Sequence, residues 1–267
     1  PYADWIDFVN ALDSPIVALD VPSGLDAETG HAPNTCIAAD LTITMIGYKH
    51  GLLTGAARNY CGEIVVASLA LPERSYHAAT SMASVIDISE VDEALPPRLE
   101  HSHKSQFGHV LVVGGNHGMA GAVRMAGEAS LRSGAGLTTV ATRPEHVSVV
   151  LANRPELMCH GIHHAEELEP LIERATVIVI GPGLGKDDWA FSLLKACLNS
   201  GLPLVIDADG LNLLAKTPMQ HEGWVLTPHP GEAARLMNTD RDAIQNDRFA
   251  APQSRQLKLI AALPQLI

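Results

Sequence analysis

Residues 109–140 constrain the fold of this chain most strongly, because they predict a strand, a loop, a helix and a second strand in direct succession. Residues 110–113 form a short apolar run that suits a strand buried on both faces. The loop 114–118 contains three glycines, and apolar residues then recur at helical spacing over 122–129. A glycine loop that leads into a helix N-terminus attracts anions, since free amides and the helix dipole favour negative charge. A tight turn in any α/β protein has the same pattern, so the stretch alone leaves both interpretations open.

The same alternation continues along the chain after residue 140. Further apolar runs predict strands at 177–180, 204–206 and 224–226. Helical patterns lie before, between and after these runs, at 144–153, 190–197, 210–215 and 233–237. Alternating strands and helices predict a parallel α/β domain with helices on both faces of the sheet. Right-handed crossovers then place all the loops that follow the strands at one edge of that sheet.

The N-terminal part predicts a separate and smaller arrangement. After a short helix within residues 1–12, apolar runs at 16–19, 41–46 and 64–69 predict three strands without room for long helices between them. We therefore expect only one side of a sheet, as in a partial domain over residues 1–72. Residues 73–97 are acidic and contain a Pro-Pro pair, and they predict a linker. A second domain, also partial, is expected over residues 98–267.

Charge and composition exclude several classes of function. The formal net charge of −12 argues against nucleic acid as a partner. No apolar run has the length of a membrane span and no signal peptide is present, so we expect a cytoplasmic protein. Four cysteines (Cys36, Cys61, Cys159 and Cys197) lie far apart and fit no metal spacing, which predicts reduced core residues. His101 and His103 lack a spaced partner and predict a solvated turn.

Four loops carry the candidate chemistry, and they are expected to converge at the sheet edge: 114–118, 181–185, 207–212 and 227–232. Two of them are glycine loops, one has two carboxylates and one has a histidine between two prolines. Together they predict a cleft for a phosphorylated ligand. Each also has a structural interpretation: Asp207 and Asp209 as helix caps, His229 as a structural histidine, and Glu232 as a favourable charge in a first helical turn. We expect the prolines, which restrict backbone φ, to hold the loop around His229.

Five segments together resemble the NAD(P)H-hydrate dehydratase domain, which has a ribokinase-like fold: 102–104, 114–115, 181–185, 207–209 and 227–232. Residues 18–26 (Ala-Leu-Asp-Val-Pro-Ser-Gly-Leu-Asp), with Lys49 further on, resemble the C-terminal part of the NAD(P)H-hydrate epimerase domain. This order is that of bifunctional bacterial cofactor-repair enzymes. The resemblance implies an α/β protein in which a partial Rossmann-like epimerase domain precedes a partial ribokinase-like domain with a mostly parallel sheet.

The resemblance also implies an activity and its site residues. The epimerase interconverts the two epimers of hydrated NAD(P)H, and the dehydratase converts the S epimer back to NAD(P)H with ADP or ATP and magnesium. In the epimerase site, Asp20 is expected to bind the hydrate and Ser23 a potassium ion. In the dehydratase site, Ala122, Gly183 and His229 are expected to contact the hydrate. Small-molecule substrates and a homo-oligomer are implied as partners.

Two departures from the family pattern separate the hypotheses. No Asn- and Gly-rich loop precedes Asp20, and no Lys-Gly strand end or Gly-x-Gly-Asp helix start follows Glu232. The expected catalytic base therefore lies outside the chain, and no catalytic residue is assigned within it. A non-catalytic nucleotide-binding fragment is one alternative. A sugar or vitamin kinase of the same fold is another, although the segment around Ser23 argues against it.

Overall fold

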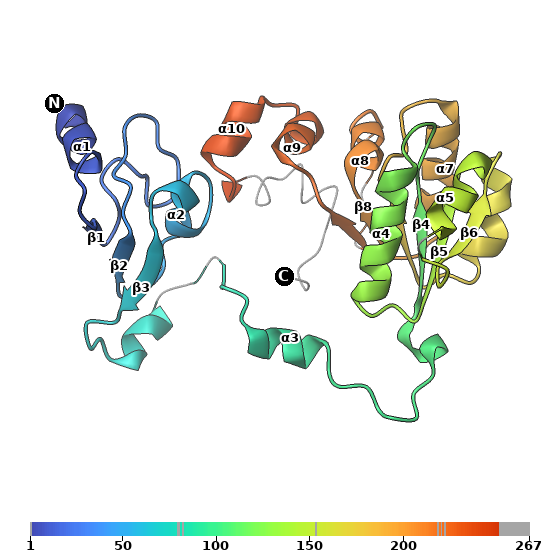
Figure 1. The fold of residues 1–267 in the computed structure, drawn as a ribbon, viewed down its shortest axis with the longest axis horizontal. Coiled ribbons are helices and arrows are strands. Elements are labelled where there is room, and N and C mark those ends of the chain that lie inside the picture. Colours follow the sequence, from blue (N-terminus) through green and yellow to red (C-terminus); the bar gives the residue numbers. More distant parts are fainter. Residues whose placement is uncertain are drawn as a thin grey trace. The chain divides into compact units, whose positions relative to one another are not determined.

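The computed structural model describes residues 2–78, 81, 83–152, 154–217, 219, 221 and 223–250 (Figure 1). These residues form two compact units. The first contains the chain up to Val91 together with the segment that begins at Asp240, and the second contains Asp92–Thr239. The division falls inside helix α3 (Ile88–Ala94), within the predicted linker. No helix in the described ranges is long and apolar enough to cross a membrane.

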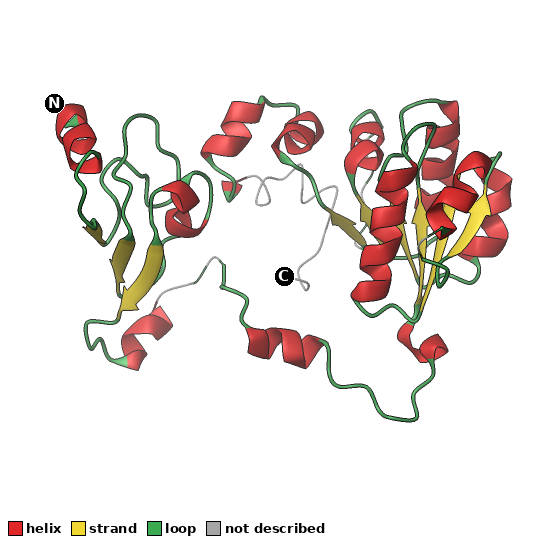
Figure 2. Ribbon diagram, viewed as in Figure 1, coloured by secondary structure: helices red, strands yellow, loops and turns green. Residues whose placement is uncertain are grey.

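The first unit is built on a three-stranded parallel sheet in the order β1-β2-β3 (Figure 2). Its strands are β1 (Val17–Leu19), β2 (Leu41–Met45) and β3 (Glu63–Ala67), and its helices include α1 (Ala3–Asn10), α2 (His50–Leu53) and α10 (Arg241–Asn246). The three strands predicted from the apolar runs are confirmed. This unit has a small buried core that contains Leu25, Cys36, Leu52, Ala57 and Cys61, and Ile64 of β3 packs against it.

The second unit has a six-stranded parallel sheet in the order β6-β5-β4-β7-β8-β9. Its strands are β4 (His109–Val113), β5 (Leu137–Thr142), β6 (Met158–Gly161), β7 (Val177–Ile180), β8 (Leu204–Ile206) and β9 (Trp224–Leu226). Its α-helices beyond α3 include α4 (Ala120–Arg132), α5 (Val147–Leu151), α6 (Glu169–Ile172), α7 (Asp188–Leu198), α8 (Ala208–Leu214) and α9 (Pro230–Met237). This is the predicted α/β class, although strand β6 was not predicted from the sequence.

The two faces of the larger sheet differ in burial. On one face, residues that share register positions on β4, β7 and β8 are almost fully buried, among them Leu111, Ile178 and Leu204. On the other face, the partners Val179 and Val205 are only partly buried and line a groove of about 740 Å³ beside α4. The valine-rich run of β7 thus suits a strand with apolar surface on both sides.

Candidate functional site

The strand order places a crevice at the carboxyl ends of β4 and β7. From β4 the chain moves outward to β5 and β6, and it then crosses back to β7 on the other side of β4. In open parallel sheets, ligands bind where the strand order reverses in this way. Strands β4, β7, β8 and β9 are also parallel neighbours, so the loops that follow them leave the same edge. The predicted convergence of the four loops is therefore confirmed.

The two glycine loops interlock at this crevice. The Gly115 amide donates to the Pro182 carbonyl at 3.0 Å, and the Asn116 amide donates to the Gly183 carbonyl at 2.6 Å. A Cβ on Gly114 would lie 2.2 Å from the Pro182 carbonyl oxygen, which is too close for any side chain. Glycine is therefore required where the backbones approach, and the loops form one rigid pair.

Two predicted hydrate contacts adjoin each other in this pair of loops. Gly183 has a φ of +60°, and a Cβ placed on it would lie 3.1 Å from the Ala122 Cβ. Gly183 is buried and Ala122 is half-buried in the first turns of α4. The structure therefore brings the loop after β7 against the first turn of α4, at a helix N-terminus, where anions are favoured.

The two carboxylates of the third loop are engaged with neighbouring loops. Asp207 lies at the N-cap position of α8 but its side chain caps no amide; it accepts a hydrogen bond from the Thr227 hydroxyl at 2.9 Å. Asp209 accepts the Gly185 amide at 3.1 Å, and the Lys186 ammonium lies 3.5 Å from its other oxygen. The helix-cap hypothesis fails for Asp207, and both carboxylates instead join adjacent loops.

His229 has a capping role that corrects one expectation. It is the N-cap of α9, and its Nδ1 accepts the Gly231 amide at 2.9 Å and the Glu232 amide at 3.4 Å. The buried Glu232 carboxylate accepts the His229 backbone amide at 3.0 Å and lies 3.1 Å from Nε2. The imidazole, and not the prolines alone, therefore holds this loop. Because both ring nitrogens contact protein atoms, the predicted contact with a hydrate stays a prediction.

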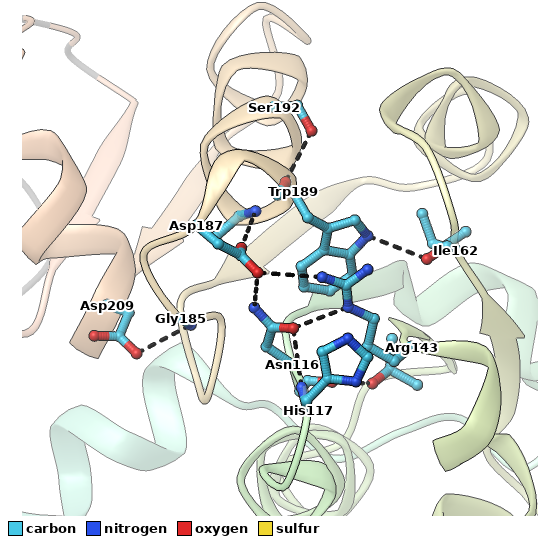
Figure 3. A network of polar contacts seen from close by, with 12 residues as sticks. Asn116, His117, Arg143, Ile162, Gly185, Asp187, Trp189, Ser192 and Asp209 are labelled. Carbon is cyan, nitrogen blue, oxygen red and sulfur yellow. Dashed lines mark hydrogen bonds and ion pairs between the residues drawn. The ribbon is translucent and has the colours of Figure 1, made fainter.

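Sequence reasoning did not assign a role to a polar network beside the glycine loops (Figure 3). Asn116, Arg143 and Asp187 contact one another there, each from the loop after a different strand. The sequence signal was weak, since an asparagine between glycines is also an ordinary turn residue. Only the strand order shows that these three residues meet.

The first unit has its own polar cluster at the carboxyl end of β1. Asp20 lies directly after this strand with a φ of +69°, a conformation that is uncommon for residues other than glycine. Its Oδ1 accepts the Met45 amide at 3.0 Å and contacts the Lys49 ammonium. The same ammonium donates to the Thr44 hydroxyl at 3.0 Å and to the Met45 carbonyl at 2.9 Å. The predicted hydrate-binding carboxylate is thus held in place from the neighbouring strand.

These contacts keep Asp20 ionised. The hydrogen bond from Lys49, followed by that from the Met45 amide, holds the pKa of Asp20 below its ordinary value. All three protons of the ammonium have an acceptor among the contacts described, so Lys49 orients the carboxylate.

Ser23, the predicted potassium ligand, is exposed in the loop after Asp20. Its backbone carbonyl accepts the Ile37 amide at 2.9 Å. The Ser23 hydroxyl is the kind of hard oxygen donor that such cations take. Within the described parts of the chain, no group of three or more His, Cys, Asp and Glu side chains could hold a metal ion.

The four cysteines are free, and burial raises the pKa of the Cys36 and Cys159 thiols to about 11. Three of them are buried and Cys159 is half-buried. Thiols with a raised pKa are poor nucleophiles, which agrees with the prediction of reduced core residues.

Solved structures define the class of the second unit as ribokinase-like. A ribokinase-like superfamily protein from Enterococcus faecalis V583 is 37% identical, with a TM-score of 0.56 over 61% of this chain and 58% of that chain. An ADP/ATP-dependent NAD(P)H-hydrate dehydratase from Bacillus subtilis, co-crystallized with ATP/Mg²⁺, is 25% identical, with a TM-score of 0.53 over 66% of this chain and 65% of that chain.

The family model described as NAD(P)H-hydrate dehydratase matches residues 110–263, and the model described as YjeF-related protein N-terminus matches residues 1–51. The chain belongs to the NAD(P)H-hydrate dehydratase family. It is 51% identical to the bifunctional NAD(P)H-hydrate repair enzyme Nnr of Coxiella burnetii, over 97% of this chain and 53% of that protein. Identity to the Escherichia coli K12 enzyme of the same name is 46%, over 91% of this chain and 47% of that protein. The chain thus spans about half the length of these curated relatives.

Proposed function

We propose that this chain acts in the repair of hydrated nicotinamide cofactors, with a dehydratase site in the second unit and an epimerase site in the first. Membership of the NAD(P)H-hydrate dehydratase family supports this proposal. The relatives named above are described as bifunctional NAD(P)H-hydrate repair enzymes, and they match nearly the whole chain. The observation that carries the proposal is the pair of interlocked glycine loops, where Gly183 adjoins Ala122.

The dehydratase chemistry suits an edge built from backbone amides. A hydroxyl group leaves carbon poorly and phosphate leaves well, so transfer of phosphate from ADP or ATP to the ring hydroxyl makes its elimination feasible. Phosphoryl transfer depends mainly on positioning and on stabilisation of charge. The N-terminus of α4 would supply such stabilisation without net positive charge, whereas the Gly115 and Gly185 amides are already bonded to protein oxygens. Magnesium bound to the nucleotide would neutralise phosphate charge, and we assign no magnesium ligand to the described residues.

In the proposed epimerase site, the ionised Asp20 binds the hydrate. One carboxylate oxygen, Oδ1, is occupied by Lys49 and the Met45 amide. The carboxylate is thereby oriented before a ligand arrives, which lowers the entropic cost of binding. The Ser23 hydroxyl would contribute one oxygen to a potassium ion beside it.

We further propose the domain division predicted from the sequence, with an epimerase part over 1–72, a linker over 73–97 and a dehydratase part over 98–267. A homo-oligomer in the cytoplasm, acting on NAD(P)H hydrate and ADP or ATP, completes the proposal. The support for these features is the resemblance of the chain to the family.

Calorimetric titration with the S epimer of NADPH hydrate tests the dehydratase site, with NADPH as the control ligand. We expect the hydrate to bind more tightly than NADPH, and we expect no recovery of reduced-nicotinamide absorbance when ADP is added. The second expectation follows from the missing Gly-x-Gly-Asp motif, because a positioned proton acceptor contributes roughly 10²–10⁴-fold to a rate. Absence of hydrate binding would refute the proposed site. Turnover comparable with that of an intact relative would show that another residue is the base.

A second candidate is a chain that binds nucleotide without turnover. Binding of ADP without any binding of the hydrate would support that candidate. Phosphorylation of a sugar or a vitamin would instead support a kinase of the same fold.

A further inference from the structure

Arg143, Asn116 and Asp187 form a closed triangle beside the glycine loops, and the proposed function gives them no role (Figure 3). Asn116 lies in the loop after β4, Arg143 directly follows β5, and Asp187 precedes α7 in the loop after β7. All three belong to the second unit. Every side of the triangle is a polar contact, so side chains join all three loops, and backbone hydrogen bonds also join the two glycine loops.

Asn116 connects the triangle to the glycine loops. It is buried, with 6% of its surface exposed, and its side-chain amide donates to Asp187 Oδ2 at 3.0 Å. Its Oδ1 accepts the Arg143 Nε at 2.9 Å. Its backbone amide donates to the Gly183 carbonyl at 2.6 Å. A shift of the Asn116 side chain would therefore displace the backbone contact to Gly183.

Arg143 is fixed from three sides. Its side chain is only 16% exposed, and a terminal nitrogen lies 3.3 Å from Asp187 Oδ2. Its guanidinium lies 3.9 Å from the centre of the Trp189 ring, and the Trp189 indole donates to the Ile162 carbonyl at 3.1 Å. A lysine could not replace these contacts, because it lacks the planar group that bonds two acceptors and stacks on a ring.

Asp187 closes the triangle and caps a helix. Its Oδ1 accepts the Ala190 amide at 3.0 Å as the N-cap of α7, and its Oδ2 faces both Asn116 and Arg143. Burial alone would raise its pKa, but hydrogen bonds from Asn116 and Ala190 and the charge of Arg143 hold the pKa below the ordinary value. The carboxylate is therefore held in its ionised form, and each of its oxygens accepts a hydrogen bond.

From this geometry we propose that Arg143 is a positioning residue of the dehydratase site, acting through Asn116 and Asp187 to hold the two glycine loops in place. This inference rests on the proposed function of the second unit. The route runs from the Arg143 guanidinium to Asn116, through the Asn116 amide to Gly183, and from Gly183 to its neighbour Ala122. Arg143 itself does not need to contact the ligand.

Amide hydrogen exchange in this chain tests the positioning role without any ligand. We compare Arg143→Met and Arg143→Lys with the control Arg124→Met, which removes an arginine that pairs with Glu128 within α4 of the same unit. In both Arg143 variants the Asn116 backbone amide should exchange about tenfold faster. The local opening that exposes this amide then no longer has to break the contacts of Arg143. The Ile178 amide, bonded to the Pro203 carbonyl, should be unaffected and reports global unfolding.

Calorimetry with the S epimer of NADPH hydrate tests the consequence for the site. We expect Arg143→Met to raise the hydrate Kd about tenfold, since small misplacements of positioning groups have large effects, and Arg124→Met to leave it unchanged. Unchanged exchange at Asn116 would overturn the inference, as would equal acceleration at Asn116 and Ile178, which would indicate a merely structural role. Faster exchange with an unchanged hydrate Kd would also overturn it. If the unmodified chain binds no hydrate, the proposed function fails, and exchange still decides whether Arg143 holds the loops.

Discussion

Substitution of His229 tests whether this histidine is a helix cap, a ligand contact or both. His229→Ala removes the Nδ1 acceptor of the Gly231 and Glu232 amides, and loss of an N-cap costs about 0.5–2 kcal/mol. It also removes the contact of Nε2 with the Glu232 carboxylate, but the histidine side chain is 62% exposed, so this pair contributes at most about 1 kcal/mol. The capping loss therefore dominates, and a domain of this size should melt roughly 2–8 °C lower.

His229→Asn separates the two roles. Asparagine is among the best N-cap residues, so this variant should melt close to the unmodified chain. Asparagine has no counterpart of the histidine Nε2. The affinity of this variant for the S epimer of NADPH hydrate should therefore fall as far as that of His229→Ala, by about 1–3 kcal/mol. Thermal melts followed by circular dichroism, together with calorimetric titration of both variants, measure the two quantities.

Two results would refute the reasoning. If His229→Ala melted at the same temperature as the unmodified chain, the imidazole would not hold the loop, and its capping contacts would add nothing to the stability of the fold. If both variants bound hydrate normally while only His229→Ala lost stability, His229 would be a structural residue and the predicted ligand contact would be wrong.

Three further predictions concern the remaining site residues. Lys49→Met should raise the Asp20 pKa toward its ordinary value in a carbon-NMR titration, while Asp26, whose pKa is held down first by the Thr29 amide, should not respond. A carboxyl group whose pKa is lower in the folded than in the unfolded chain stabilises the fold at pH values above its ordinary pKa. This stabilisation is lost as the pH falls through the lowered pKa, so the variant, which lacks it, should be less stable at neutral pH. An unchanged Asp20 titration would contradict this prediction. Gly183→Ala, with a φ of +60° and a Cβ that would lie 2.8 Å from the Met119 Cβ and 3.1 Å from the Ala122 Cβ, should cost about 1–3 kcal/mol in urea unfolding, and an unaltered midpoint would rule out this crowding. In a protein with both activities, Ser23→Ala should weaken epimerisation and its potassium dependence but not dehydration; a parallel fall of both rates would show that the two-site assignment is wrong.

Sequence patterns predicted most strands because their signal is local. The apolar runs of β4 and β7 are valine- and isoleucine-rich, and such runs suit strands with both faces covered. Strand β6 (Met158–Gly161) has no such run, since its sequence is Met-Cys-His-Gly. It forms at the edge of the sheet because β5 offers it a partner, and that pairing is a property of the tertiary structure.

The site divides in the same way between local and distant information. The glycines of the first loop and the turn residues around Gly183 were visible in the sequence, and their family resemblance identified the candidate hydrate contacts. The capping role of His229 was not visible in the sequence. A proline restricts its own backbone in any context, whereas the hydrogen bonds of an imidazole depend on where the next helix begins.

The amino-acid sequence by itself determined where strands, glycine loops and helices alternate, because side-chain periodicity and backbone freedom act over a few residues. The tertiary structure alone decided which loops meet. Asn116, Arg143 and Asp187 are separated by 27 and 44 residues along the chain, and they are neighbours because the sheet places β5 and β7 on either side of β4. A hydrogen bond between distant residues follows from strand order, and strand order is set by the packing of the whole sheet.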